Sequence, residues 1–222
     1  MAERKNIKTR DPEATKARIM AAAKVEFATM GLGGARVDVI AAQADVQKRM
    51  MYHYFGNKEV LYRLVLEQAY ADFRKAEAEL EIEKDAPIVA LRRLVEFTWN
   101  YYLANPEFIS LVNTENLHKA KYLRQVPRLE LLNKSFVKRM EGLLARGVAD
   151  GVFRSGLDAV QILIALAGVG FHYLTNQYTG EIVYGRPLMT EAARKARLAF
   201  NIDVVTRLVV RPEVLAKMQE AA

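Results

Sequence analysis

Apolar residues recur every three or four positions along nearly the whole chain, and no stretch alternates clearly at every second position. This spacing lines apolar side chains along one face of an α-helix. The first segment illustrates the pattern, because its apolar residues are Ile19, Ala23, Phe27 and Met30. The pattern predicts an all-α protein of about nine helices.

Helix-capping residues indicate where these segments begin and end. Asp11 is suited to the N-cap of the first helix and Pro12 to its first turn, while Gly31 is suited to end it. Asp45 is expected in the turn after a short second helix. The later helices are expected at roughly 48–55, 58–81, 86–104, from 105 onward, from 127 to about 147 or 151, at 157–178 and at 188–210.

The segment from Lys48 to Phe55 separates into two chemically different faces. At about 100° per residue, one half of this helix carries Lys48, Arg49, Tyr52 and His53, and the other carries Met50, Met51, Tyr54 and Phe55. The apolar half anchors the helix, since burying each residue of this size stabilises a fold by roughly 1.5–3 kcal/mol. The polar half presents four groups that hydrogen-bond phosphate oxygens or base edges.

A short helix with this face, after another short helix and a tight turn, is typical of a helix-turn-helix that docks in the major groove of double-stranded DNA. Lys58 adds a cation beside a helix N-terminus, which favours a phosphate contact. The alternative is an ordinary solvated basic face above core rings. The order of three helices favours the DNA-binding interpretation, as do the basic residues Arg4, Lys5, Lys8 and Arg10 before them.

The charge distribution points to the same part of the chain. The 222 residues carry 33 Lys and Arg against 26 Asp and Glu, a net charge of +7. Residues 1–62 hold eleven basic and seven acidic residues, whereas the other 160 residues hold 22 and 19. A basic balance favours an anionic partner, and we expect the N-terminal quarter to contact it.

At residues 10–65 the sequence resembles the TetR family of transcriptional regulators. The matching positions, in the family's order and spacing, are Ala22, Ala23, Phe27, Gly31, Ile40, Ala41, Ala44, Val46, Tyr52, Phe55, Lys58, Glu59 and Leu61. The chain departs from the family pattern around the reading helix. Asp45 replaces a turn glycine, Gln47 replaces a capping serine, and Arg49-Met50-Met51 replaces Gly-Thr-Leu. Asp tolerates the left-handed turn conformation, so these departures affect base preference more than the fold.

The resemblance implies roles for individual residues. Tyr52 and Lys58 are expected to contact phosphates, and Lys48, Arg49 and His53 to read bases, with Gln47 and Arg36 completing the expected DNA-binding set. It also implies an effector pocket and a dimer interface in the helices that follow. We therefore expect a basic flexible arm at 1–10, a helix-turn-helix domain at 11–57 and a ligand-binding and dimerisation domain at 58–222.

The C-terminal half shows a more limited similarity to RutR-like regulators, which identifies no ligand. Candidate effector-binding residues are polar or aromatic side chains on otherwise apolar helices: Trp99, Tyr102, Phe108, Asn113, Asn116, Tyr122 and Phe171. Plain core packing is the alternative for each. Small residues at 165–171, including Ala165 and Gly168, allow close helix approach, and we expect the last two helices to form a homodimer seam, with tight packing inside one chain as the alternative.

Other classes of site find little support. The chain has no cysteine, which excludes disulfides and thiolate metal sites. Glu115 and His118 form half of a di-iron motif, and neither His53 nor His172 completes it. The Gly31-Leu-Gly-Gly run follows a helix and not a strand, which disfavours a nucleotide loop. We expect no catalytic residue, no metal, no cofactor and no membrane span, and a cytoplasmic location.

Two functions remain open. The first is a ligand-responsive bacterial transcriptional regulator, most simply a repressor, which binds a palindromic operator as a dimer and is released by a small organic effector. The alternative is a non-enzymatic α-helical adaptor whose basic face binds an acidic protein or a membrane surface. Only the first predicts a preference among DNA sequences.

Overall fold

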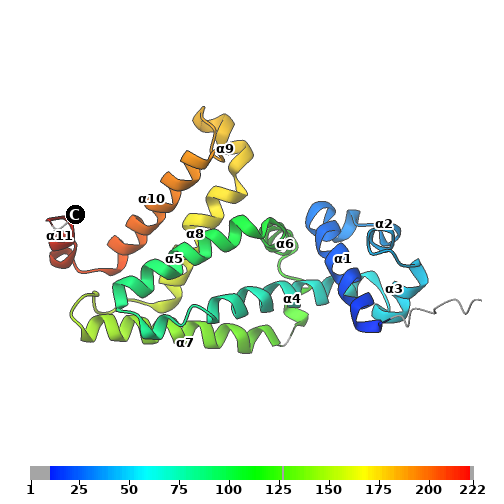
Figure 1. Ribbon diagram of the computed structural model, residues 1–222, viewed down its shortest axis with the longest axis horizontal. Helices are drawn as coiled ribbons and strands as arrows, with labels where there is room; N and C mark the ends of the chain where they lie inside the picture. The colour runs from blue at the N-terminus through cyan, green and yellow to red at the C-terminus, as the bar shows by residue number, and fades with distance from the viewer. Residues whose placement is uncertain (1–10, 127, 221–222) are drawn as a thin grey trace, which may run out of the picture. The chain divides into compact units, whose positions relative to one another are not determined.

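The computed structural model describes residues 11–126 and 128–220, with the backbone alone at 128–133, and these residues form eleven α-helices and two 3-10 turns (Figure 1). They divide into two compact units. We call residues 11–68 and 110–126 the head unit, and residues 69–109 and 128–220 the body unit. The expected all-α fold, with an N-terminal helix-turn-helix, is confirmed.

The head unit contains α1 (Pro12–Gly34), α2 (Val37–Gln43), α3 (Lys48–Phe55), the first part of α4 (Lys58–Ala78), the second part of α6 (Pro106–Leu117) and the 3-10 turn η2 (Leu123–Gln125). The head unit defined by contacts therefore does not end at residue 57. The domain boundary that the sequence analysis places there remains a prediction. The buried residues that hold this unit together include Ile19, Phe27, Ile40, Leu61, Tyr62 and Leu66.

Capping residues fix the first helix as the sequence predicts. The Asp11 carboxylate accepts hydrogen bonds from the N–H groups of Glu13 (2.9 Å) and Ala14 (3.3 Å). Gly31 has φ +63° and ψ 175°, so the helical backbone stops there, and a short further turn reaches Gly34. A side chain at positive φ is strained, which explains why glycine ends this helix.

The body unit contains the rest of α4 and α6, the 3-10 turn η1 (Ile82–Lys84), and the helices α5 (Pro87–Ala104), α7 (Arg128–Ala149), α8 (Ala159–Thr175), α9 (Gln177–Tyr184), α10 (Glu191–Val209) and α11 (Pro212–Glu220). Helices α5, α7, α8 and α10 pack around one apolar core. Its most buried members include Leu91, Leu94, Met140, Leu143, Val205 and Val209. A single antiparallel bridge between Phe153 and Val210 ties the loop after α7 to the end of α10.

The described residues form two more helices than the nine expected from the sequence, and both are short. The stretch 177–184 was expected to lie partly in a loop, but Asn176 ends α8 and begins α9, with a bend of 76° between the two helices. Gly180 permits this arrangement, since an added Cβ would lie 2.8 Å from Leu188 Cδ1. The second is α11, where Pro212 occupies the first turn, a position that suits its fixed φ.

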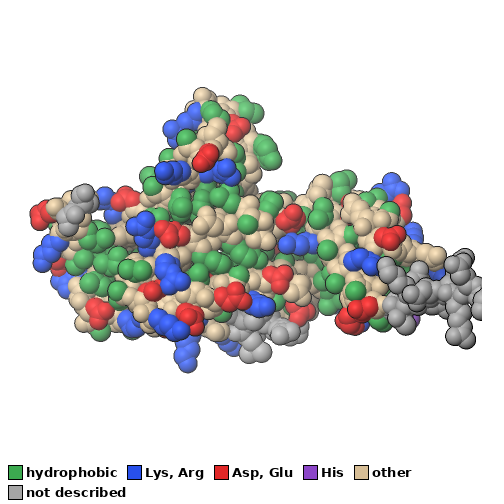
Figure 2. All heavy atoms as spheres, viewed as in Figure 1, with side chains coloured by type: hydrophobic (Ala, Val, Ile, Leu, Met, Phe, Trp, Pro, Cys, Tyr) green, Lys and Arg blue, Asp and Glu red, His purple; other side chains and the backbone are tan. Residues whose placement is uncertain are grey.

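Among the described residues, no single helix is both long enough and apolar enough to cross a membrane. Helices α8 and α9 would meet that criterion only as a bent pair, on length and composition alone. On the face drawn in Figure 2, basic and acidic side chains of the body unit are intermixed along the lower edge of the picture. This edge therefore carries mixed charge and no field of a single sign.

Two glycines of α7 allow a direct test of the body core. An added Cβ at Gly147 would lie 2.0 Å from Cδ2 of the buried Phe153, whereas one at Gly142 meets nothing within 4 Å. We expect Gly147→Ala to destabilise the protein by about 1–3 kcal/mol through overpacking. Gly142→Ala should stabilise it by up to about 1 kcal/mol, because alanine favours helix. Urea unfolding measures both, and equal effects would contradict this packing.

Candidate nucleic-acid interface and effector region

Helix α3 is held to the head unit by its apolar half. Met51 and Phe55 are 3% and 8% exposed, and Met50 and Tyr54 are half-buried. A helix of eight residues has no stability in isolation, so this burial keeps α3 helical. The division into two faces that the sequence predicts is therefore present in the structure.

The opposite half of α3 faces solvent. Lys48, Arg49, Tyr52 and His53 are all exposed, and Gln47 precedes them as an exposed N-cap. Within the described part of the chain, neither Lys48 nor Arg49 has a hydrogen-bond or ion-pair partner. An external acceptor can therefore bind the two cations, the Tyr52 hydroxyl or the His53 ring nitrogens without first breaking an internal bond.

The turn between α2 and α3 has the geometry expected of it. Asp45 adopts φ +52°, in the left-handed region, and the N–H of Val46 returns to the carbonyl of Ala41 at 3.0 Å. After α3, Gly56 has φ +74° and the Asn57 carboxamide accepts from the N–H of Val60 at 2.9 Å, which starts α4. Asp45 thus adopts the left-handed turn conformation at the position where the family pattern has glycine.

Two side chains of α1 position α2, and sequence reasoning missed both. The Glu26 carboxylate, 8% exposed, accepts from the N–H of Arg36 at 2.9 Å. The Arg18 guanidinium donates through Nε to the carbonyl of Ala44 at 3.1 Å. These bonds satisfy one backbone group at each end of α2. Glu26 carried a signal, since it is an acid on the apolar face of α1, one residue before Phe27.

Lys58 has an internal partner as well as its expected external one. Its ammonium group is half-buried and donates to the carbonyl of Ala35 at 3.1 Å. An ammonium has three donors, so this bond leaves two for another acceptor. The structure thus adds a positioning role at the junction of α1 and α2, and a phosphate contact remains a prediction.

Arg36 forms an exposed ion pair. Its Nη2 lies 2.7 Å from Asp38 Oδ2 and its Nε 3.3 Å from Oδ1. The hydrogen bond from Arg36 lowers the pKa of Asp38 below its usual value. A phosphate would have to compete with this carboxylate for Arg36, so the structure favours Arg36 less as a DNA contact than Arg49, which has no ion-pair partner among residues 11–126 and 128–220. The basic arm at residues 1–10 lies outside the described residues.

The expected effector residues are divided between the two units. Trp99, Tyr102, Phe108 and Phe171 lie in the body unit, where the Tyr102 ring centroid is 6.1 Å from that of Phe108 and 6.2 Å from that of Phe171. Phe73 of α4 stacks on both Tyr102 and Phe108. Burial raises the pKa of Tyr102 to about 12, so its hydroxyl stays protonated and can donate at neutral pH.

The other three expected effector residues belong to the head unit. Asn113 and Tyr122 are half-buried and Asn116 is exposed. The Tyr122 ring meets the Tyr62 ring at 5.4 Å, and Asn116 Nδ2 donates to the carbonyl of Val112 on its own helix at 3.0 Å. These contacts are ring packing and a side-chain bond to the backbone of α6, both within the head unit. The seven candidates therefore include one body-unit group of four aromatic residues.

A buried charged cluster next to this aromatic group also escaped the sequence analysis. Glu77, 2% exposed, lies 2.8 Å from Arg139 Nη1 and 3.5 Å from Arg74 Nη1. The Arg74 guanidinium lies over the rings of Phe73 (5.0 Å) and Phe136 (3.7 Å). Arg74 and Glu77 stand three residues apart on α4, a spacing that favours such a pair and could have indicated it.

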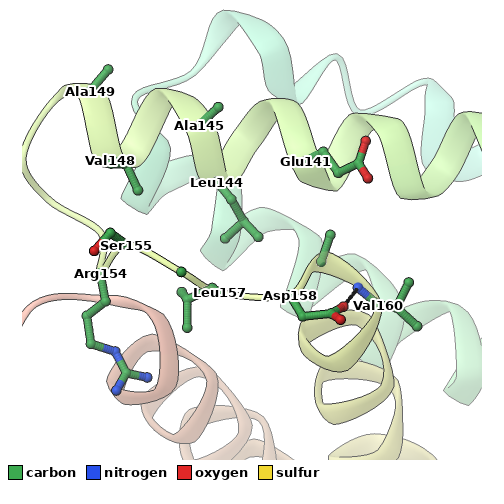
Figure 3. Close-up of a pocket in the computed structure, with 12 residues that line it drawn as sticks. Glu141, Leu144, Ala145, Val148, Ala149, Arg154, Ser155, Leu157, Asp158 and Val160 are labelled. Atoms are coloured by element: carbon green, nitrogen blue, oxygen red, sulfur yellow. Dashed lines mark hydrogen bonds between the residues drawn. The ribbon is translucent and has the colours of Figure 1, made fainter.

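An open groove of about 860 Å³ lies elsewhere in the body unit, between the end of α7 and the start of α8 (Figure 3). Leu144 and Val148 point from α7 toward the loop that carries Leu157 (Figure 3). Asp158 lies at its edge and caps α8 by accepting from the N–H groups of Val160 (2.7 Å) and Gln161 (3.1 Å). None of the seven expected effector residues lines this groove.

The Glu115 and His118 pair has local partners. Glu115, 2% exposed, accepts from the N–H groups of Tyr122 (3.2 Å) and Leu123 (2.9 Å), and the His118 ring lies 2.8 Å from the carbonyl of Thr114. Glu115 thus anchors the turn after α6. Among the described residues, no group of three or more His, Cys, Asp or Glu side chains is placed to hold a metal ion.

Comparison with known proteins agrees with this architecture. The family of bacterial regulatory proteins named tetR matches residues 19–65, and the tetracyclin repressor-like C-terminal domain matches residues 87–205. The chain is 33% identical over 201 residues to the transcriptional repressor NicS of Pseudomonas putida, covering 90% of this chain and 95% of that protein.

Two further comparisons extend over almost the same length. The chain is 27% identical over 205 residues to the transcriptional regulator RutR of Escherichia coli K12, covering 91% of this chain and 92% of that protein. The structure of the regulator SCO4942 of Streptomyces coelicolor aligns with a TM-score of 0.67 at 25% identity, covering 89% of this chain and 99% of that chain. With both family domains matched in chain order over a helix-turn-helix, the chain belongs to the tetR family of bacterial regulatory proteins, which are non-enzymatic DNA-binding transcription regulators.

Proposed function

We propose that the protein is a homodimeric repressor that binds a near-palindromic operator through α3 and leaves it when a small organic effector binds the body unit. The observation that carries this proposal is the division of α3 into a buried apolar half and an exposed half, whose two cations have no partner among the described residues. Such a face is what a recognition helix presents to the major groove.

The residues of this face differ in what they can contact. Arg49 offers the paired donors that recognise guanine O6 and N7, and Lys48 and His53 lie beside it on the same face. Tyr52 and Lys58 carry donors suited to phosphate oxygens. Gln47 lies at the N-terminal end of α3, where it adds an amide near the bases. We assign base reading to the first group and phosphate binding to Tyr52 and Lys58.

Dimerisation would use the outer faces of α8 and α10. Val160 and Ile164 on α8 are 45% and 60% exposed, and Phe200 on α10 is 53% exposed. The exposed Gly168 lies one turn after Ile164, and an added Cβ there meets nothing within 4 Å, so a second chain could approach closely. Two-fold symmetry would then place two copies of α3 on half-sites about 34–36 Å apart.

Effector control would act through helices shared by both units. Helices α4 and α6 each contribute residues to the head unit and to the body unit. An effector that binds the body unit more tightly in one arrangement shifts the population of dimers able to span both half-sites. Such coupling is typically about 1–3 kcal/mol, or roughly 5–150-fold in DNA affinity.

Selection from a randomised duplex pool at about 150 mM salt tests the operator proposal. We expect purified protein to enrich a near-palindromic site that outcompetes random duplex by about a thousandfold or more. Retention of DNA without a shared site, or no retention, would instead favour an adaptor that binds an acidic protein or membrane surface.

Arg49→Ala should relax base preference at one position of each half-site, with a loss of about 1–3 kcal/mol on the preferred sequence. His53→Ala should act in the same way at a neighbouring position. Lys84→Ala is the matched control, because it removes one exposed positive charge from the body unit. Binding of single-base operator variants measures the effect, and an equal loss on every sequence would contradict base reading.

Lys58→Ala should weaken binding to all sequences alike. If Lys58 neutralises a phosphate, the slope of log K against log salt becomes shallower by about 0.9. If its only role is the bond to the Ala35 carbonyl, the unfolding temperature falls and the salt slope stays the same. Titrations at four salt concentrations, with the Lys84→Ala protein beside them, separate these two roles. A changed base preference would overturn both.

A further inference from the structure

Helix α9 exposes apolar side chains although its backbone is held in the body unit. Tyr178, Ile182 and Val183 are 77%, 84% and 73% exposed, and helical spacing places them within about 140° of one another on the outward side. On the inward side, the Glu181 carboxylate accepts from the N–H of the buried Leu188 at 2.8 Å. Hydrophobic side chains therefore reach the surface at the tip of the α8–α10 hairpin (Figure 1, Figure 2). We call Tyr178, Ile182 and Val183 the α9 patch.

The α9 patch has the character of a contact surface. A single exposed apolar residue needs no explanation, but a contiguous group on one helix marks a place where another surface binds. The anchor at Leu188 would serve equally well if the outward residues were polar. The exposed side chains thus contribute little to the fold of one chain, and they are suited to an apolar surface outside it.

The groove between the end of α7 and the start of α8 is a second apolar surface, and no segment within residues 11–126 and 128–220 fills it. It is lined by Leu144, Val148, Leu157 and Val160, with charged side chains such as Glu141 at its border (Figure 3). Its volume of about 860 Å³ falls among the clefts of roughly 300–1,000 Å³ that enclose a small ligand. The groove therefore has room for the side chains of one helix face.

The α9 patch and the groove belong to opposite ends of α8. Val160, which lines the groove, stands eight residues before the exposed Gly168, and Asn176, where α9 begins, stands eight residues after it. Eight residues span about 12 Å along a helix. Within one chain the two surfaces are therefore separated by about 24 Å along α8 and cannot meet.

A two-fold axis that crosses α8 at Gly168 would bring the two surfaces together. An added Cβ at Gly168 meets nothing within 4 Å, so the α8 helices of two chains could approach closely there. If the axis is perpendicular to α8, these helices run antiparallel, as their dipoles favour, and Val160 lies beside the partner's Asn176. Because a two-fold contact is reciprocal, each chain offers its α9 patch once and its groove once.

The area that a stable dimer needs supports this arrangement. A standard interface buries about 800 Å² of each partner. The outer faces of α8 and α10 offer four large apolar side chains that are between 36% and 60% exposed, namely Val160, Ile164, Phe200 and Leu208. Even if each had the roughly 200 Å² of an aromatic side chain, these four would supply only about half of that area. Burial of the α9 patch in a groove adds area on both partners.

We propose that α9 of each chain docks in the α7–α8 groove of a second copy, with its α9 patch against Val148, Leu157 and Val160. Each chain then holds the other at two symmetric sites, one on either side of Gly168. The inference deepens the homodimer of the proposed function and rests on that dimer. It requires neither an operator nor an effector, so it can be tested without either.

Disulfide trapping in the full-length protein tests the arrangement directly, because the chain has no cysteine of its own. Two double variants combine Ile182→Cys with Ser155→Cys or with Val148→Cys, and residues 148 and 155 both line the groove. A disulfide requires Cα atoms within about 7 Å of each other, which the length of α8 prevents inside one chain. We expect mild oxidation to convert at least one double variant into a covalent dimer on a non-reducing gel.

Two controls accompany the trapping. Val89→Cys combined with Ile182→Cys is the matched pair, because Val89 is an exposed valine of α5 that does not line the groove, and it should form no covalent dimer. Ile182→Cys alone should form none either. Covalent dimers from Ile182→Cys alone would overturn the proposal, because they would place the two α9 helices against each other. The absence of covalent dimers from both groove pairs would also overturn it.

Sedimentation equilibrium separates the docking of α9 from dimerisation itself. Ile182→Asp should weaken self-association about tenfold or more, since it would bury a carboxylate in an apolar groove, whereas Val89→Asp should leave it unchanged. A wild-type protein that sediments as a monomer would overturn the homodimer of the proposed function, and this proposal with it. A wild-type dimer that Ile182→Asp leaves equally stable would overturn the docking of α9 alone.

Discussion

The burial of Met51 and Phe55 is the interaction on which the DNA-facing surface depends. An eight-residue helix without a side-chain cap does not hold its own shape, so α3 takes both its helicity and its orientation from these two anchors. Once they are buried, helical geometry places Lys48, Arg49, Tyr52 and His53 on the solvent side. A shift of the anchors by one position would rotate the exposed face by about 100° and turn a different set of side chains outward. The bonds of Arg18 and Glu26 to the two ends of α2 serve the same purpose, because α2 forms part of the wall against which α3 packs.

The head unit also contains chain segments far from the helix-turn-helix in sequence. Tyr62 of α4 packs against Phe27 of α1 on one side and against Tyr122, beyond α6, on the other. Glu115 holds the backbone of Tyr122 and Leu123 in place. A change in the direction of α6 would therefore reach Tyr62, and through it the packing of α1, without breaking a covalent or ionic link. This chain of contacts gives the proposed effector response a physical route inside the head unit.

Local sequence information was sufficient for some of this arrangement. The two faces of α3, the turn at Asp45 and the capping by Asp11 follow from periodicity and residue type within a few positions. The bond of Lys58 to Ala35 and that of Arg18 to Ala44 join residues 23 and 26 positions apart, and no local pattern specifies such pairs. For the same reason the sequence does not assign Asn113, Asn116 and Tyr122 to one unit and Trp99 to the other. Polar or aromatic residues on apolar helices look alike in sequence, whereas membership of a compact unit depends on contacts between distant segments.

Helices α8 and α10 carry different chemistry on their inner and outer faces. Their inner faces bring Gly170 and Asn201 close together, and their outer faces expose Ile164 and Phe200. A ligand that bound equally well to every arrangement of these helices would leave the DNA-binding population unchanged, whatever its affinity. A ligand that contacts α8 and α10 at once does not meet that condition, because its contacts fix the separation of the two helices. Its binding free energy therefore depends on how α8 packs against α10, and the packing of these two helices also sets the shape of the face on which a second chain would dock.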